Sequence, residues 1–296
     1  MWLKSLLGAL FLLSLAGAFI FAPEAENGHN HEGHANIRVE NDRRLRLLSW
    51  NIGNGDLESE SRAHSEDLPA VAKVILDNDV DAVALQELTG KEQLKLLLTY
   101  LNDGYDGQVA SPGNGDRVEA VLVRKASAQI KNGRNREGRG EANVNFSDVP
   151  ASDRFAAAAS FGLGNDSPEV LFLSAHADAF SASRRRAFAE AATDWARDHG
   201  KSELAFIAGD FNFEVSTRNR NNLFTDDAKH DSEAYAYLLK YFRDLGADAG
   251  ETSINDRRID YVFGPVTSVT LHRAVVLRSA SVGRMDHWPL LVEVGF

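Results

Sequence analysis

Carboxylate, amide and imidazole side chains stand at or near the ends of several apolar segments of this sequence. In chain order they are Asn51, Glu87, His176, Asp210, Asn212, Asp260, Asp286 and His287. If the segments bring their ends to one rim, these side chains would form the kind of polar constellation that holds a metal ion or moves protons. Any one of them alone is more simply a capping or turn residue, but repetition of the same arrangement along the chain favours a shared site.

The last two members of this set, Asp286 and His287, come just before Pro289 and an apolar run. The run at 290–294 has the composition of a buried strand, and proline fits the first position of such a strand. An acid and an imidazole at this point would be held on a rigid support, where sites are usually built. The alternative is an ordinary turn aspartate followed by a surface histidine.

The apolar segments that must position these groups alternate between strand-like and helix-like patterns. Strands are expected at 45–51, 81–87, 118–123, 154–161, 170–174, 204–208, 259–263, 269–277 and 290–294, and helices at 66–76, 91–100 and 183–197. Interleaved strands and helices, with hairpin-like pairs of strands between them, predict a layered α/β domain with mixed sheets.

The composition is that of an ordinary globular protein. A chain of 296 residues that is 44% hydrophobic can bury a substantial core, which predicts one domain or one domain with an appendage. Its formal net charge of −11 argues against binding nucleic acid by bulk charge, although a local basic groove remains compatible with it. The absence of cysteine excludes disulfides, thiolate metal sites and a cysteine nucleophile.

The first 22 residues, which are apolar or small apart from Lys4, predict either a signal peptide or an N-terminal membrane anchor. The small residues 16–18 offer a cleavage site, whereas cleavage there would expose the large apolar residues 19–21 on the new end, which favours an uncleaved anchor. In either case the rest of the chain is expected outside the cytoplasm, periplasmic or secreted, and tethered to the membrane if the segment stays.

Residues 23–44 are polar and aperiodic, as in a linker. His29, His31 and His34 in this segment could chelate a transition metal weakly, although histidines in such a tract more often bind nothing specific. The predicted catalytic domain then covers residues 45–296.

Six motifs in this domain resemble, in their order and spacing, those of the endonuclease/exonuclease/phosphatase superfamily, which includes deoxyribonuclease I. They read LLSWNIG, VALQEL, SAHA, AGDFN, RIDYVF and RMDHWP and run from about residue 45 to the C-terminus. The resemblance implies a four-layer α/β/β/α sandwich, in which two mixed sheets pack face to face and the helices lie outside. It also implies a metal-dependent hydrolase of phosphodiesters, without specifying the substrate.

By this resemblance, Glu87 is the principal metal ligand, assisted by Asn51 and Asp286. Mg²⁺, with Mn²⁺ or Ca²⁺ as alternatives, suits such a shell of hard oxygen ligands. The cation is needed because hydrolysis of a phosphodiester adds charge to oxygens that already repel a nucleophile. The chain departs from the pattern of apurinic endonucleases at Gly53, where those enzymes carry an acid, so a metal contact from this position is missing.

The same resemblance assigns catalytic roles to five further residues. His287 is similar to the imidazole at the scissile phosphate, with Asp260 fixing its tautomer and raising its basicity. Asp210 and Asn212 resemble the pair that positions or activates the attacking water, and His176 the second imidazole, which donates to the phosphate or the leaving oxygen. The sequence leaves open whether Asp210 or the Asp260–His287 pair takes the proton from water.

Several basic residues are candidates for contacts with substrate phosphates. Arg154 opens a predicted strand where family members often carry a phosphate-facing arginine, and Arg184–Arg186 open a predicted helix, although such a run is more often a solvated helix face. In the segment 131–140 the candidates are Lys131, Arg134, Arg136 and Arg139. This basic segment could follow a nucleic-acid backbone from a hairpin loop, or be only a solvated turn.

The hypotheses for function are therefore ranked by substrate. An extracytoplasmic nuclease is preferred because of the basic segment 131–140. A sphingomyelinase-like or inositol-phosphate-type enzyme acting on lipid head groups or small phosphates is the alternative, and the N-terminal segment favours it. A binding module without activity is the remote alternative, because every position expected to act in catalysis holds a residue that is chemically able to do so.

Aromatic residues at 235, 237, 241 and 242 could stack bases, but their helical spacing favours core packing.

Overall fold

The computed structural model describes residues 43–53, 67–110, 117–128, 144–163, 168–200, 204–215, 228–254, 256–280, 282 and 285–296. All of them belong to one compact unit. The predicted signal or anchor segment, the three linker histidines, Lys131, Arg134, Arg136 and Arg139 lie outside these residues. Within the described part of the chain, no helix combines the length and the apolar character needed to cross a membrane.

Two six-stranded sheets form the framework. The first has the order β11-β12-β1-β2-β4-β3, with β1 at Arg44–Asn51, β2 at Ala82–Leu88, β3 at Tyr105–Val109, β4 at Val118–Arg124, β11 at Thr270–Val276 and β12 at Leu290–Gly295. The second has the order β5-β6-β7-β8-β10-β9, with β5 at Val144–Ala151, β6 at Arg154–Gly162, β7 at Glu169–His176, β8 at Leu204–Asp210, β9 at Arg243–Asp244 and β10 at Asp260–Gly264. Both sheets are mixed: β1 and β2 pair in parallel, as do β7 and β8, and the other pairs are antiparallel.

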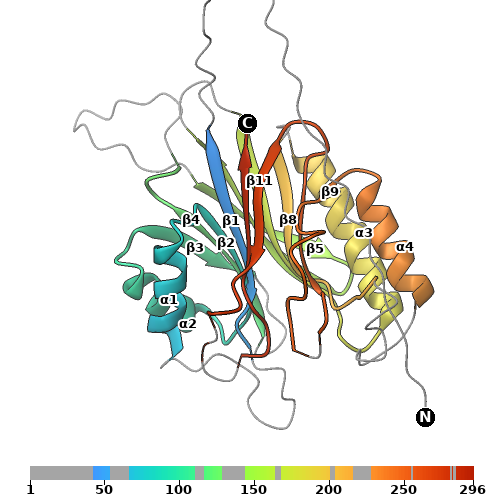
Figure 1. Cartoon of the computed structure of the whole chain (residues 1–296), viewed down its shortest axis with the longest axis horizontal. Helices are drawn as coiled ribbons and strands as arrows, with labels where there is room; N and C mark the ends of the chain where they lie inside the picture. The colour runs from blue at the N-terminus through green and yellow to red at the C-terminus, as the bar shows by residue number, and fades with distance from the viewer. Residues whose placement is uncertain are drawn as a thin grey trace, which may run out of the picture. The chain divides into compact units, whose positions relative to one another are not determined.

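Helices cover the two outer faces. Helices α1 (Leu68–Asp77) and α2 (Lys91–Tyr100) lie beside the first sheet, and α3 (Ala182–His199) and α4 (Ala228–Leu239) beside the second (Figure 1). The fold is therefore the predicted four-layer α/β/β/α sandwich.

The sequence produces this layering because its central strands are apolar on both faces. In β1, Leu45 and Leu47 pack between the two sheets, whereas Leu48 and Trp50 pack toward the helices. The same alternation places Phe206 of β8 between the sheets and Ile207 against the helices. Such strands read as continuous apolar runs, and they can be stable only in the interior of a layered structure.

The predicted elements were largely confirmed, and the helical spacing of the aromatic residues from 235 onward corresponds in part to α4, but β3, β5 and β9 were missed. The segment of β3, YDGQV, is short and contains a glycine, and β5, VNFSDVPA, is an edge strand that is largely exposed and contains a proline. Glycine and proline in an exposed edge strand remove the apolar alternation by which a strand is recognised.

Two side-chain interpretations have clear outcomes. The solvated-face interpretation of the run 184–186 is wrong for Arg185, which is fully buried and forms an ion pair with Asp231 of α4. Core packing is confirmed for Phe242, which is buried, and for Tyr235, whose ring packs against those of Phe213, Tyr261 and Phe263. It is wrong for Tyr241, which is exposed.

Candidate active site

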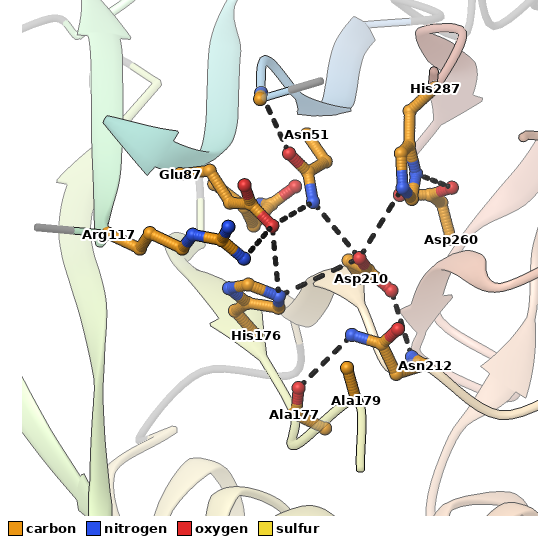
Figure 2. Close-up of polar contacts among 12 residues, drawn as sticks. Asn51, Glu87, Arg117, His176, Ala177, Ala179, Asp210, Asn212, Asp260 and His287 are labelled. Atoms are coloured by element: carbon orange, nitrogen blue, oxygen red, sulfur yellow. Dashed lines mark hydrogen bonds and ion pairs between the residues drawn. The ribbon is translucent and has the colours of Figure 1, made fainter. Parts of the chain in front are cut away.

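The two parallel strand pairs bring their carboxyl ends together at one rim of the sandwich. Asn51 ends β1 and Glu87 lies near the end of β2, while His176 and Asp210 end β7 and β8 as neighbours in the ladder. Asp260, the first residue of β10, pairs with Asp210 from the other side. Figure 2 shows Asp210 at the centre of the group, between the imidazoles of His176 and His287.

Glu87 is directed into the site by an irregularity in its strand. The pairing of β2 with β4 shifts register between Leu85 and Leu88, and Glu87 has a φ of 62°. A bulge of this kind changes the direction of a side chain, and a left-handed conformation at a residue other than glycine is a strain that functional sites often retain. The side chain of Glu87 is buried, and its Oε2 has no hydrogen-bond partner.

Asn51 joins two of the acids through its amide nitrogen. Nδ2 donates to Glu87 Oε1 at 3.2 Å and to Asp210 Oδ2 at 3.0 Å, while Oδ1 accepts a hydrogen bond from the amide of Gly53 at 2.9 Å. The amide nitrogen, rather than the oxygen expected of a metal ligand, thus faces the two carboxylates. In this structure Asn51 fixes the positions of Glu87 and Asp210.

Asp210 is held by the backbone around it. Gly209, with a φ of 150°, approaches β7 so closely that a Cβ there would lie 1.9 Å from the carbonyl oxygen of Ala175. Asn212, with a φ of 51°, donates its backbone amide to Asp210 Oδ1 at 2.8 Å, and its Nδ2 donates to the carbonyl of Ala177. Both polar residues of this segment are therefore rigidly placed at the end of β8.

His287 forms a buried pair with Asp260. The two side chains approach at 2.8 Å, from Nδ1 to Oδ2, which leaves Nε2 facing Asp210 Oδ2 at 3.7 Å and Asp286 Oδ1 at 3.9 Å. Burial lowers the pKa of His287, but the carboxylates of Asp260 and Asp210 outweigh it and raise the pKa to about 10. The imidazole is therefore protonated at neutral pH and can donate from Nε2.

His176 occupies a similar position on the other side of Asp210. Its Nε2 lies 3.7 Å from Asp210 Oδ2 and 3.8 Å from Glu87 Oε1, and its Nδ1 lies 3.4 Å from Glu119 Oε1. Burial lowers its pKa, and Glu119, Asp210 and Glu87 together reverse this effect and raise it. In each imidazole, Nδ1 therefore lies near a carboxylate, that of Asp260 or of Glu119, and Nε2 faces the same oxygen of Asp210.

Sequence reasoning missed four residues that belong to this site. Glu119 and Arg117 enter from the start of β4, where residues two apart face the same side, and Arg117 Nη1 lies 3.5 Å from Glu87 Oε1. Arg257 and Phe180 line the same pocket. The only sequence signal was a pair of charged residues at alternate positions just before the apolar part of β4.

The predicted phosphate contacts have different outcomes. Arg154 lines the pocket together with Arg117 and Arg257, close to Glu87, both imidazoles and Asp286. Arg184 is not among the residues that line this pocket, and its side chain lies within 4 Å of Asp153 and Asp178. The arginines of the basic segment lie outside the described residues, so their contact with phosphate stays a prediction.

The donor set suits a hard divalent cation. Glu87 Oε2 and Asp286 Oδ1 are buried oxygens without hydrogen-bond partners in a shared pocket, and burial raises the pKa of Asp286. Ligand atoms of Asp210, Asp260 and His287 also gather within 4.8 Å of one another. In that second group, however, His287 Nδ1 and Asp260 Oδ2 already form a hydrogen bond with each other. The oxygens of Glu87 and Asp286 are therefore the ones that could hold a divalent cation, since a buried carboxylate oxygen without a hydrogen bond is costly.

Comparison with protein families gave one match, in which the model of the Endonuclease/Exonuclease/phosphatase family covers residues 48–282. Comparison with curated proteins gave no match.

Several solved structures share the fold. A protein of the endonuclease/exonuclease/phosphatase family from Bacteroides thetaiotaomicron is 19% identical, with a TM-score of 0.65 over 86% of this chain and 98% of that one. A mannosyl-6-phosphatase from the same organism is 20% identical, with a TM-score of 0.65 over 85% and 100%. The human Nocturnin catalytic domain with bound sulfate is 17% identical, with a TM-score of 0.62 over 85% and 93%.

Proposed function

This chain belongs to the endonuclease/exonuclease/phosphatase family, whose members hydrolyse phosphoester bonds, and we propose that it is a divalent-metal-dependent phosphodiesterase acting on nucleic acid outside the cytoplasm. The observation that carries the proposal is the pair of imidazoles facing Asp210 Oδ2, each 3.7 Å away, beside buried carboxylate oxygens that lack hydrogen-bond partners. This arrangement combines an acceptor for a proton of water with donors for phosphate oxygens.

Glu87 and Asp286 would hold the cation, with Mg²⁺ preferred for their oxygen ligands. When bound, the cation would neutralise charge on the phosphate. Asn51 would hold the carboxylates of Glu87 and Asp210 at a fixed distance from each other, and Arg154 would supply further positive charge at the wall of the pocket.

Asp210 is the group that we assign as the base for water. A protonated His287, with a pKa of about 10, cannot accept a proton at neutral pH, whereas the carboxylate of Asp210 can. Asn51 and the backbone of Asn212 leave this carboxylate little freedom to rotate. His287 and His176 then act as donors to the phosphate and the leaving oxygen.

Nucleic acid is the substrate that we prefer. Arg117, Arg154 and Arg257 line the pocket, and the sequence supplies a further basic segment at 131–140. Such a set favours a substrate that presents more than one phosphate. The extracytoplasmic location, with a membrane tether if the first 22 residues are retained, rests on their apolar sequence.

A small phosphate ester is the second candidate. The pocket has a volume of about 70 Å³, which admits a phosphoryl group with a few water molecules, and one of the proteins with the same fold is a mannosyl-6-phosphatase. In this second case the substrate of the present protein would be a phosphomonoester whose organic part stays outside the cavity.

A substrate panel tests the proposal. The purified full-length protein is incubated in Mg²⁺ or in EDTA with plasmid DNA, RNA, sphingomyelin vesicles, inositol phosphates and mannose 6-phosphate. We expect cleavage of the nucleic acids in Mg²⁺ only. Release of phosphate from mannose 6-phosphate with intact DNA would support the second candidate, and hydrolysis of sphingomyelin alone would replace both. Protease treatment of spheroplasts tests the location, since a protected catalytic domain would contradict it.

A further inference from the structure

The short segment after His176 contributes Ala179 and Phe180 to the lining of the pocket. Phe180 is 52% exposed, although large aromatic residues are normally well buried. An exposed aromatic residue thus lines the same pocket as Arg154 and His176, and most of the other lining residues are charged.

Phe180 is held in place by Asp178. The Oδ1 atom of Asp178 accepts hydrogen bonds from the backbone amides of Phe180 at 2.8 Å and Ser181 at 2.7 Å. These bonds lower the pKa of Asp178 against the effect of its burial, together with Arg154 and Arg184. Its Oδ2 lies 3.5 Å from Arg154 Nη2, so one carboxylate contacts both the backbone of Phe180 and the guanidinium of a residue that lines the pocket.

A fully buried ion pair fixes the same segment from behind. Arg185 of α3 pairs with Asp231 of α4 at 2.9 Å, and both side chains are almost completely inaccessible. The guanidinium of Arg185 also donates from Nη1 to the carbonyls of Asp178 at 3.2 Å and Ala179 at 3.3 Å. The backbone before Phe180 is thus bonded to the helical layer, and its exposed ring is carried by a rigid support.

We propose that Phe180 is a specificity-determining residue, on which a nucleobase next to the scissile phosphate stacks while Arg154 contacts the phosphate. This inference rests on the proposed function and narrows its substrate to nucleotides with an unstacked base. Stacking suits single-stranded or frayed nucleic acid, because the face of a base is accessible there, and it gives little preference among base sequences. The charges around the pocket fit the phosphate, and the ring fits the base.

Binding without cleavage tests this inference separately from catalysis. Affinities of the full-length protein in EDTA are measured by fluorescence anisotropy for a short oligothymidylate and for an abasic oligomer with the same number of phosphates. We expect the wild type to prefer oligothymidylate about tenfold. Phe180→Ala and Phe180→Leu should lose this preference and bind the abasic oligomer as before, whereas Phe180→Tyr should keep it.

Three results would overturn the inference. They are a wild type that binds both oligomers equally, a Phe180→Ala variant that keeps the preference, and a Phe180→Ala variant that instead loses binding to sphingomyelin vesicles, which would make Phe180 a lipid-contacting residue. Because the oligomers are not cleaved in EDTA, absence of hydrolysis in the substrate panel would contradict the proposed function without deciding the role of Phe180.

Discussion

At the scale of single residues, the site depends on charges that are buried next to one another. Asp210 faces two imidazoles and one amide, and Glu87 presents one oxygen to Asn51 and another that has no hydrogen-bond partner. Each of these contacts has little water to screen it, so small chemical changes should have large effects on activity. Two predictions follow from individual side chains.

Glu87→Gln should lower kcat/KM by a factor of about 1,000 or more. The substitution removes the negative charge that would hold the cation and leaves the shape of the side chain nearly unchanged. The same variant should lose the stabilisation of the folded protein by Mg²⁺, which a thermal unfolding curve with and without Mg²⁺ would detect. Glu92→Gln, on the exposed face of α2, is the matched control. A folded Glu87→Gln variant with normal activity would remove Glu87 from the metal site.

Asp260→Asn should change how stability depends on pH. The pKa of His287 is raised from about 6.5 in an unfolded chain to about 10 in the folded protein, so its pair with Asp260 stabilises fully below about pH 6.5 and less as the pH rises toward 10. The difference in unfolding free energy between wild type and Asp260→Asn should therefore be largest near pH 6 and shrink toward pH 10, as urea denaturation would show. A difference that grew with pH would mean that His287 is neutral in the folded state.

At the scale of secondary structure elements, the site is held by irregular points in regular elements and by contacts between layers. The bulge in β2 directs Glu87, Gly209 allows β8 to lie close to β7, and Arg185 joins α3, α4 and the pocket wall. These features act on stability as well as on the position of catalytic groups. Two predictions test them.

Gly209→Ala should destabilise the protein by more than about 4 kcal/mol, because its Cβ would overlap the backbone of Ala175 in addition to the cost of a positive φ. Gly250→Ala is the matched control, since Gly250 also has a positive φ but has open space around its Cβ position. It should cost only about 1–2 kcal/mol. Equal losses for the two variants in chemical denaturation would show that the close approach of β7 and β8 is unimportant.

Arg185→Met should destabilise the fold by about 3–5 kcal/mol, because it removes the guanidinium that lies 2.9 Å from the buried carboxylate of Asp231. The double variant Arg185→Met with Asp231→Leu should recover much of that stability, since an apolar pair replaces a buried ion pair at little cost. In both variants the pocket wall loses the hydrogen bonds to Asp178 and Ala179, so KM should rise even where the fold recovers. An unchanged KM in the double variant would show that the wall is rigid without Arg185.

At the scale of the whole molecule, a chain with a net charge of −11 must bind a polyanion through a local concentration of positive charge. The pocket provides three arginines, and the sequence adds the segment 131–140. Binding by such a segment releases counterions from the substrate, so it depends on salt and not on base sequence.

Replacing Arg134, Arg136 and Arg139 together by serine should raise KM for DNA at low salt and flatten its dependence on salt. Hydrolysis of bis-nitrophenyl phosphate, which has no neighbouring phosphates, should hardly change. Steady-state kinetics at several salt concentrations would measure both. A triple variant with the salt profile of the wild type would exclude the segment from substrate binding.

Local sequence patterns were enough to predict the layers of this protein and most of the polar residues that the structure brings together at the rim. Strands that are apolar on both faces, such as β1 and β8, can be buried only between other layers, and polar residues at their ends can only face the rim. The family motifs pointed to Glu87, Asp210 and His287, and in the structure these three residues line one pocket. Local pattern and motif order carry this information because it is encoded within short segments.

The other residues of the site could be found only from contacts between distant parts of the chain. Glu119 meets His176 across 57 positions, and Arg185 meets Asp231 across 46, so no local spacing announces either pair. The direction of the Asn51 amide and the exposure of Phe180 likewise depend on neighbours supplied by other strands and helices. These properties arise from packing between distant segments, so they cannot be predicted from local sequence patterns.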